Sequence, residues 1–410
     1  MKRIIIILLM MGYTLNSWGQ DSLGSYLQYA YAHHPSLKAA YTRFEIALQQ
    51  VPQVKALPDP KVSFGFFISP VETRVGPQQA KFSLSQQFPW FGTLEARGNA
   101  AVLKAEAFYQ GFIEERNRIG NQVKMAYYPI YELNQHIKWQ EENLEILKSY
   151  KLLATTAFSN GKGTLTDALR VDIMIENTKT DIQILKDKLR PLEIVFNRKL
   201  NREEAMGVSI AETLTIESLE ADYRKDSLTA QNPSLQAFDI RIKAAKAQEE
   251  VAKKNALPKF GLGLDYALVG SRTDANPTDN GKNILMPMVS VSLPISKSKY
   301  NAAIKEQQLK QLMLQSKKEA VVNNLWADYE TAWYSLDKSI TLNKLYNQQI
   351  KKTIQVIDLL QTSYSNSGKD FEEILRMQQQ LLKYQMAKAS VVKDYYLALA
   401  KLDYLTAKSN

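Results

Sequence analysis

Residues 56–68 of this chain read ALPDPKVSFGFFI, and residues 256–268 read ALPKFGLGLDYAL. Both stretches open with Ala-Leu-Pro and continue into a segment in which apolar side chains alternate with small or polar ones. Alternation with a period of two is typical of a β-strand that has one apolar face. The two stretches therefore predict two related strands, and they indicate that the chain contains one structural unit twice.

Two further motifs occur in both halves of the chain: His34-Pro35-Ser36-Leu37 recurs as Asn232-Pro233-Ser234-Leu235, and Leu169-Arg170 recurs as Leu375-Arg376. A period of about half the chain is far longer than the roughly 20–50 residues of a solenoid repeat, so a large unit has been duplicated. We predict a first unit over residues 20–215 and a second over residues 216–410. Each consists of a helix pair, two short strands and a hairpin of two long helices.

Residues 1–19 have the pattern of a cleaved secretory signal peptide. Lys2 and Arg3 precede an apolar run over residues 4–11, which is too short to span a bilayer; a short membrane anchor is the alternative. The chain has no cysteine, so an exported form must fold without disulfides. The formal net charge is +10, but the lysines are scattered along predicted helices, and we expect no nucleic-acid partner.

The alternating pattern predicts four strands, at about 61–69, 80–88, 259–268 and 285–293. Strands of this length with an apolar and a polar face suit a membrane β-barrel, and a half-buried strand of a soluble sheet is the alternative. Four strands cannot close a barrel, and open sheet edges are not tolerated in lipid, so several chains must combine. Three chains would supply twelve strands, an even number within the usual range.

Two predicted helices are unusually long, from Thr93 to about Phe158 and from Ser296 to about Tyr364. Globular helices average about a dozen residues. The last helix carries a heptad seam, which predicts left-handed coiled-coil packing: Ile374, Met377, Leu381, Tyr384, Lys388, Val391, Tyr395, Ala398, Leu402 and Leu405. Pro129 and Pro191 are expected to kink or break their helices.

Together these motifs resemble the outer-membrane efflux protein family, to which TolC belongs. The Pro-Ser-Leu and Ala-Leu-Pro motifs are two parts of the resemblance, and the passage from strand to helix is a third. The stretch SQQFPWFG at residues 85–92, with Pro89 and Gly92, is similar to this joint in the CzcC- and CusC-like heavy-metal-export branch. The second unit keeps Pro294 but lacks the glycine, so its joint resembles that branch less.

In this family, the turns between the long helices form a periplasmic tip that narrows the duct and docks an adaptor. The turns here are 158–167 and 364–373. The resemblance implies that the docking residues are Phe158, Asn160, Gly161, Gly163, Tyr364, Asn366 and Gly368. It implies that the gate residues are Asp167, Glu373, Lys162, Lys369 and Arg376.

The gate departs from the family pattern at three positions. Lys369 stands where the family often has arginine, Glu373 stands where it has aspartate, and Arg376 stands where some members carry an acid. Asp167 and Glu373 also have a simpler interpretation, because acids in the first turn of a helix stabilise its positive end. The sequence leaves a gate role and a purely helix-stabilising role open for both carboxylates.

The sequence contains no phosphate-binding loop, metalloprotease motif or nucleophile elbow. We therefore expect no catalytic residue, no cofactor and no resident metal. The predicted fold class is an internally duplicated α+β membrane protein whose homotrimer forms a twelve-stranded β-barrel continued by an α-helical periplasmic barrel.

The resemblance implies a passive exit duct in the outer membrane of a Gram-negative cell, with a large periplasmic portion. Its implied partners are outer-membrane lipid, a periplasmic adaptor and an inner-membrane transporter of the RND type, with metal ions as a cargo. The alternative is a periplasmic or secreted helical scaffold without channel activity.

Overall fold

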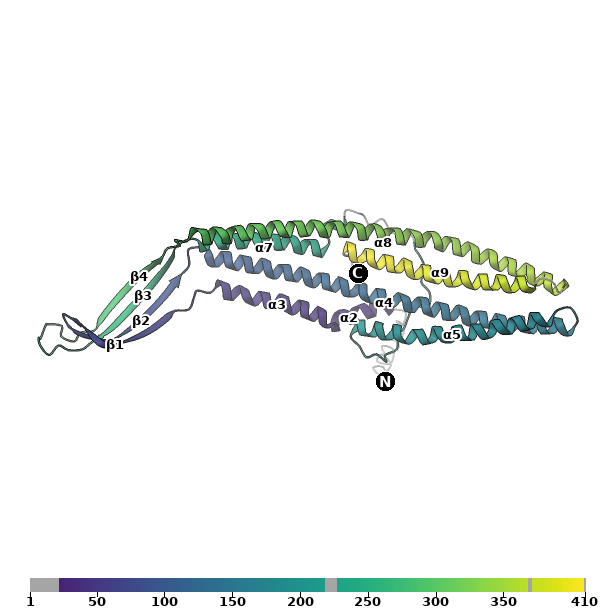
Figure 1. Ribbon diagram of the computed structural model, residues 1–410, viewed down its shortest axis with the longest axis horizontal. Coiled ribbons are helices and arrows are strands. Elements are labelled where there is room, and N and C mark those ends of the chain that lie inside the picture. Colours follow the sequence, from purple (N-terminus) through teal and green to yellow (C-terminus); the bar gives the residue numbers. More distant parts are fainter. Residues whose placement is uncertain (1–21, 218–226, 368–370, 409–410) are drawn as a thin grey trace, which may run out of the picture. The chain divides into compact units, whose positions relative to one another are not determined.

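The computed structural model describes residues 22–217, 227–367 and 371–408, and its elements follow the duplicated order (Figure 1). The first half contains α2 (Ser22–His33), α3 (Pro35–Lys55), β1 (Lys61–Thr73), β2 (Gly76–Phe88), α4 (Thr93–Ser159) and α5 (Leu165–Leu200). The second half contains α6 (Ser227–Ala230), α7 (Pro233–Asn255), β3 (Lys259–Val269), β4 (Ile284–Ser292), α8 (Lys297–Ser367) and α9 (Phe371–Thr406). The predicted signal peptide lies outside the described residues.

The four strands form one antiparallel sheet in the order β1-β2-β3-β4. The strands of the first hairpin are longer than predicted. The first continues to Thr73 instead of ending at about residue 69, and the second begins at Gly76 instead of at about residue 80. Pro70 lies where the pairing register shifts between Phe66 and Val71. A register shift tolerates a proline because no ladder hydrogen bond is required of it there.

Helices α4 and α8 are 67 and 71 residues long. Pro129 lies inside α4 and Pro191 inside α5, and both helices continue through their prolines, so neither proline breaks its helix. Among the described residues, none of the helices combines the length and the hydropathy that crossing a bilayer would require.

The chain divides into two compact units that differ from the sequence repeats. One unit comprises residues up to Ala39, Ile113–Asn232 and Val322–Asn410, and the other comprises Ala40–Phe112 and Pro233–Val321. Each unit therefore draws segments from both halves of the chain. The second unit contains the sheet with its adjoining helices, and the first contains the end of each long hairpin at which its two helices are joined.

Two apolar clusters hold the first unit together. One lies at the hairpin ends and joins α4, α5, α8 and α9 around Tyr150, Val171 and Phe371. The other packs Leu228 against α8 and α9. The predicted seam of α9 faces these cores, and its buried members are Ile374, Leu381, Val391, Tyr395, Ala398, Leu402 and Leu405.

Candidate functional site

The sheet has one apolar face and one face of polar and small residues. Register places Phe64, Phe82, Tyr266 and Leu285 in one row across the four strands. None of the described residues covers this apolar face, and Ile68 on it is 92% exposed. Since exposing so much apolar surface to water is costly, this face requires an apolar environment.

The opposite face carries polar and small side chains together with an ion pair whose carboxylate is buried. Lys81 on β2 forms an ion pair with Asp265 on β3, whose side chain is 3% exposed. Asp265 lies opposite Ser83 in the strand pairing, and the next pair on this face is Ser85 and Gly263. A wall with an apolar outer side and a polar inner side is typical of a membrane channel strand.

The joint between β2 and α4 depends on its glycine. Gly92 has φ +75°, a left-handed conformation that glycine adopts without strain. Pro89 precedes a turn in which the Thr93 amide donates to the Trp90 carbonyl at 3.0 Å. The ring of Trp90 stacks on Phe260 with centroids 5.5 Å apart, and such aromatic residues are typical of membrane interfaces.

The second joint follows a different path. Pro294 is followed by Ile295, and the Lys297 amide donates to the Ile295 carbonyl at 2.9 Å. No residue of this joint has a positive φ. The second joint therefore needs no glycine, which explains why the sequence motif is incomplete there.

The first tip turn closes α4 and starts α5. Gly161 has φ +70°, and the Lys162 amide donates to the Ala157 carbonyl at 2.9 Å, which satisfies the end of α4. Thr164 and Asp167 form a capping box, in which each side chain accepts from the other residue's amide at 3.2 Å. The carboxylate of Asp167 thus has a helix-start role in this chain.

The predicted docking residues of this turn divide into exposed and enclosed ones. Phe158, Asn160 and Gly161 are exposed, and so is the predicted gate residue Lys162. Gly163 is closely surrounded by other residues. A Cβ atom at this position would lie 3.0 Å from Ala157 Cβ and 3.3 Å from the Tyr364 hydroxyl.

The second tip is described only in part. Gly368 and Lys369 lie outside the described residues, and of Asn366 only the backbone in the last turn of α8 is described. Tyr364 is 2% exposed and packs on Phe371 with ring centroids 4.9 Å apart, so it belongs to the core of the tip rather than to its surface. Burial, aided by the charge of Asp167, raises the pKa of Tyr364.

The carboxylate of Glu373 is paired within its own helix. Arg376 Nε donates to Glu373 Oε2 at 2.9 Å, and this hydrogen bond lowers the pKa of the Glu373 carboxyl. Both predicted gate carboxylates therefore have local partners. Neither the capping box nor this pair brings Asp167 and Glu373 together in a single chain.

An ion pair that the sequence did not reveal joins the two hairpins. Arg170 on α5 donates to Glu372 on α9 at 2.5 Å, across 202 residues of sequence. The repeat supplied a partial signal, since Arg170 corresponds to Arg376 and Asp167 to Glu373. The two arginines differ in their partners, since Asp167 caps its helix and Arg170 pairs with Glu372 on the other hairpin, whereas Arg376 pairs with Glu373 on its own helix.

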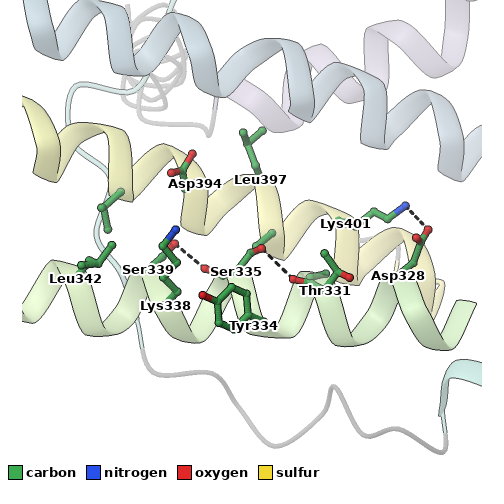
Figure 2. Close-up of a pocket in the computed structure, with 13 residues that line it drawn as sticks. Asp328, Thr331, Tyr334, Ser335, Lys338, Ser339, Leu342, Asp394, Leu397 and Lys401 are labelled. Carbon is green, nitrogen blue, oxygen red and sulfur yellow. Dashed lines mark hydrogen bonds and ion pairs between the residues drawn. The ribbon is translucent and has the colours of Figure 1, made fainter.

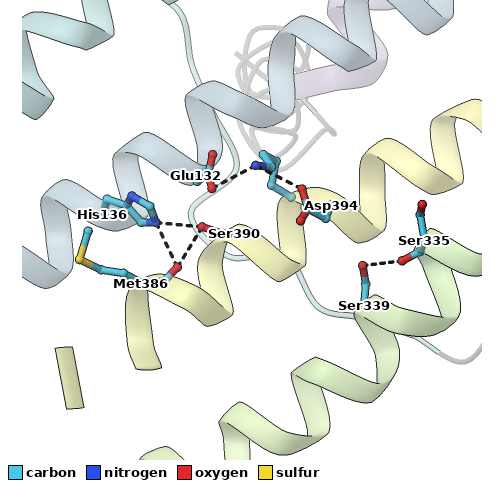
Figure 3. Close-up of polar contacts among 8 residues, drawn as sticks. Glu132, His136, Ser335, Ser339, Met386, Ser390 and Asp394 are labelled. Carbon is cyan, nitrogen blue, oxygen red and sulfur yellow. Dashed lines mark hydrogen bonds and ion pairs between the residues drawn. The ribbon is translucent and has the colours of Figure 1, made fainter. Parts of the chain in front are cut away.

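Away from the tips, polar contacts tie α4 to α9 (Figure 3). His136 lies 3.0 Å from the Met386 carbonyl and 3.4 Å from the Ser390 hydroxyl, and Lys393 lies 3.1 Å from Glu132. His136 thus serves helix packing. Within the described ranges, no group of three histidine, aspartate or glutamate side chains could hold a metal ion.

A groove of about 390 Å³ lies between α8 and α9 (Figure 2). Lys401 pairs with Asp328 at 2.7 Å along its wall. The hydroxyls of Ser335 and Ser339 donate to carbonyls of their own helix at 2.9 and 2.8 Å. These lining hydroxyls already have partners, so the groove does not indicate a particular ligand.

A family comparison agrees with this architecture. The model of the outer membrane efflux protein family matches residues 26–190 and 226–408. This chain belongs to that family. As a member of the family, this chain is a passive channel of the outer membrane with a large periplasmic helical portion, and it is not an enzyme. This outcome confirms the resemblance and sets aside the alternative of a scaffold without channel activity.

Solved structures share the fold of this efflux protein at low sequence identity. The outer membrane protein VceC from Vibrio cholerae is 16% identical, with a TM-score of 0.73, over 94% of this chain and 95% of VceC. The outer-membrane channel OprN is 15% identical, with a TM-score of 0.75, over 95% and 90% of the two chains. CusC is 15% identical, with a TM-score of 0.70, over 94% and 92%. A comparison with curated protein sequences finds no match.

Proposed function

We propose that this efflux protein is the exit duct of a tripartite system, which passively conducts what an inner-membrane pump delivers through a periplasmic adaptor. The observation that carries the proposal is the sheet with its uncovered apolar face. Strands β1 and β4 are both edges of this sheet and have no second neighbour among the described residues. Open edges are not tolerated in lipid, and three copies would close them as a twelve-stranded barrel.

The tips supply the proposed docking surface and gate. Phe158, Asn160 and Gly161 are exposed and available to an adaptor. Threefold symmetry would bring six carboxylates, from Asp167 and Glu373, around one constriction. Carboxylates in a ring favour cations, and basic partners from a neighbouring chain, such as Lys162 or Lys369, would relieve their repulsion.

Metal cations are the proposed cargo, delivered by a pump of the RND type. The support is the joint at residues 85–92, which resembles the heavy-metal-export branch. Gly92 has the left-handed backbone that makes glycine necessary in that motif. The glycine of the motif therefore has a backbone role in this turn.

The duct is tested on the purified full chain in detergent and in planar bilayers. We expect a trimer that migrates differently in gels before and after heating and that forms stable single channels. A folded monomer that remains soluble without detergent would contradict the proposal, because the apolar face would then have no need of lipid.

A further inference from the structure

Two methionines occupy the polar face of the sheet. On β4, Met286 pairs with Asp265 and Met288 pairs with Gly263, so both belong to the face that carries Lys81. The same face of β4 continues as Ser290, whereas Val289 and Val291 belong to the apolar face. Met286 and Met288 are thus large apolar side chains on the side where the remaining residues are mainly small or polar.

The two thioethers lie on adjacent positions of one face. Residues two apart on a strand point the same way and are separated by roughly 7 Å along it. The Met288 methyl lies over the neighbouring strand, because a Cβ atom built on Gly263 would be 3.2 Å from it. Both side chains are exposed, at 44% for Met286 and 37% for Met288, so neither thioether is sealed in a core.

The charges beside the methionines cancel. Asp265 is paired with Lys81, so the wall next to Met286 carries no net charge. A thioether is neutral and soft, and it favours soft cations such as Cu(I) over hard cations such as Mg²⁺ or Ca²⁺. Methionine also has three rotatable side-chain bonds, which allow two thioethers to turn toward one ion.

We infer that Met286 and Met288 form a low-affinity transit site for soft monovalent metal cations on the inner wall of the duct. The inference rests on the proposed duct and narrows its cargo from metal cations in general to soft ones. In a trimer the site would occur three times around the lumen. Exposure of both side chains suits a site that releases its ion readily, as conduction requires.

Packing alone is the competing explanation, in which Met288 merely fills the space over Gly263. Leucine conserves the volume and the apolar character of methionine but has no sulfur. The variant M286L/M288L therefore keeps the packing and removes only the ligands. The matched control is M125L/M313L, which removes two methionines of similar exposure, 44% and 45%, from α4 and α8.

The test measures binding of Ag(I), a soft monovalent cation that needs no reductant, to the full chain in detergent by isothermal titration. We expect the wild type and the control to bind alike and M286L/M288L to bind at least about ten-fold more weakly. Equal binding by all three proteins, or equal loss in the control, would overturn the inference.

Planar-bilayer recordings of the same preparations separate this inference from the proposed duct. We expect M286L/M288L to conduct like the wild type. If the wild type conducts but M286L/M288L binds Ag(I) as the wild type does, the soft-cation site is refuted and the duct stands. If the wild type forms no channel, the proposed duct fails together with the inference.

Discussion

Replacing Gly163 with alanine should destabilise the first tip by crowding. The new Cβ atom would lie 3.0 Å from Ala157 Cβ and 3.3 Å from the Tyr364 hydroxyl. Carbon atoms in favourable contact are about 3.5–4.0 Å apart. Gly163 is not among the residues with positive φ, so the cost is steric. Overpacking of this kind costs about 1–3 kcal/mol, and we expect the lower half of that range because a hairpin end can shift slightly.

The substitution Tyr364→Phe should recover part of this loss. The Tyr364 hydroxyl is buried and has no hydrogen-bond partner among the described residues, and an unsatisfied buried group of this kind costs about 1–3 kcal/mol. Tyr364→Phe alone should therefore be at least as stable as the wild type. The G163A/Y364F double variant should regain about 1 kcal/mol relative to G163A, but not everything, because the contact with Ala157 remains.

Thermal unfolding of the purified proteins in detergent, followed by circular dichroism, measures these differences. Gly161→Ala is the matched control, because an added Cβ there meets nothing within 4 Å and the cost arises from φ +70° alone. That cost is about 1–2 kcal/mol, and Tyr364→Phe should not reduce it. The reasoning is refuted if G163A melts like the wild type, or if Tyr364→Phe rescues both glycine variants equally.

Three further predictions concern charge. Changing Asp167 and Glu373 together to alanine should raise single-channel conductance and lower cation preference in planar bilayers, and unchanged currents would remove both from the constriction. Arg170→Glu should loosen the contact between the hairpins and increase channel opening, whereas adding Glu372→Arg should restore the wild-type current; failure of this swap would mean that the pair does not hold the tip. Hydrogen bonds from Gln311, Lys253 and Gln308 lower the pKa of Glu249 to about 2. The stabilisation of the folded state by these hydrogen bonds is therefore complete above the ordinary pKa of 4.5 and is lost as the pH falls toward 2. Replacing Glu249 with glutamine should therefore lower the melting temperature at neutral pH and make no difference at the acid end of that range, and an equal effect at both pH values would contradict this assignment.

The strands and long helices could be predicted from the sequence because their signals are local. Apolar and polar or small residues alternate along a strand whose successive side chains point to opposite faces of the sheet, and both β1 and β3 show this alternation over consecutive residues. The heptad seam of α9 likewise predicted part of its buried face, since seven of its ten positions are buried, but Phe371, Leu375 and Val392 are buried outside the seam. The extent of the first hairpin could not be predicted, because the register shift that accommodates Pro70 exists only once β1 and β2 pair.

At the tips, only the packed structure distinguishes residues that look equivalent in sequence. Gly161 and Gly163 both mark a turn, but Gly161 is needed for its backbone angle and Gly163 for the approach of Tyr364. Arg170 and Arg376 occupy matching repeat positions, yet Arg376 pairs within its own helix and Arg170 reaches the other hairpin. The sequence by itself determined the duplicated units, the helix ends and the two-faced strands, because these follow from backbone preferences and local hydrophobic pattern. The tertiary structure decided which charges and rings meet, because contacts across some two hundred residues depend on how the hairpins pack.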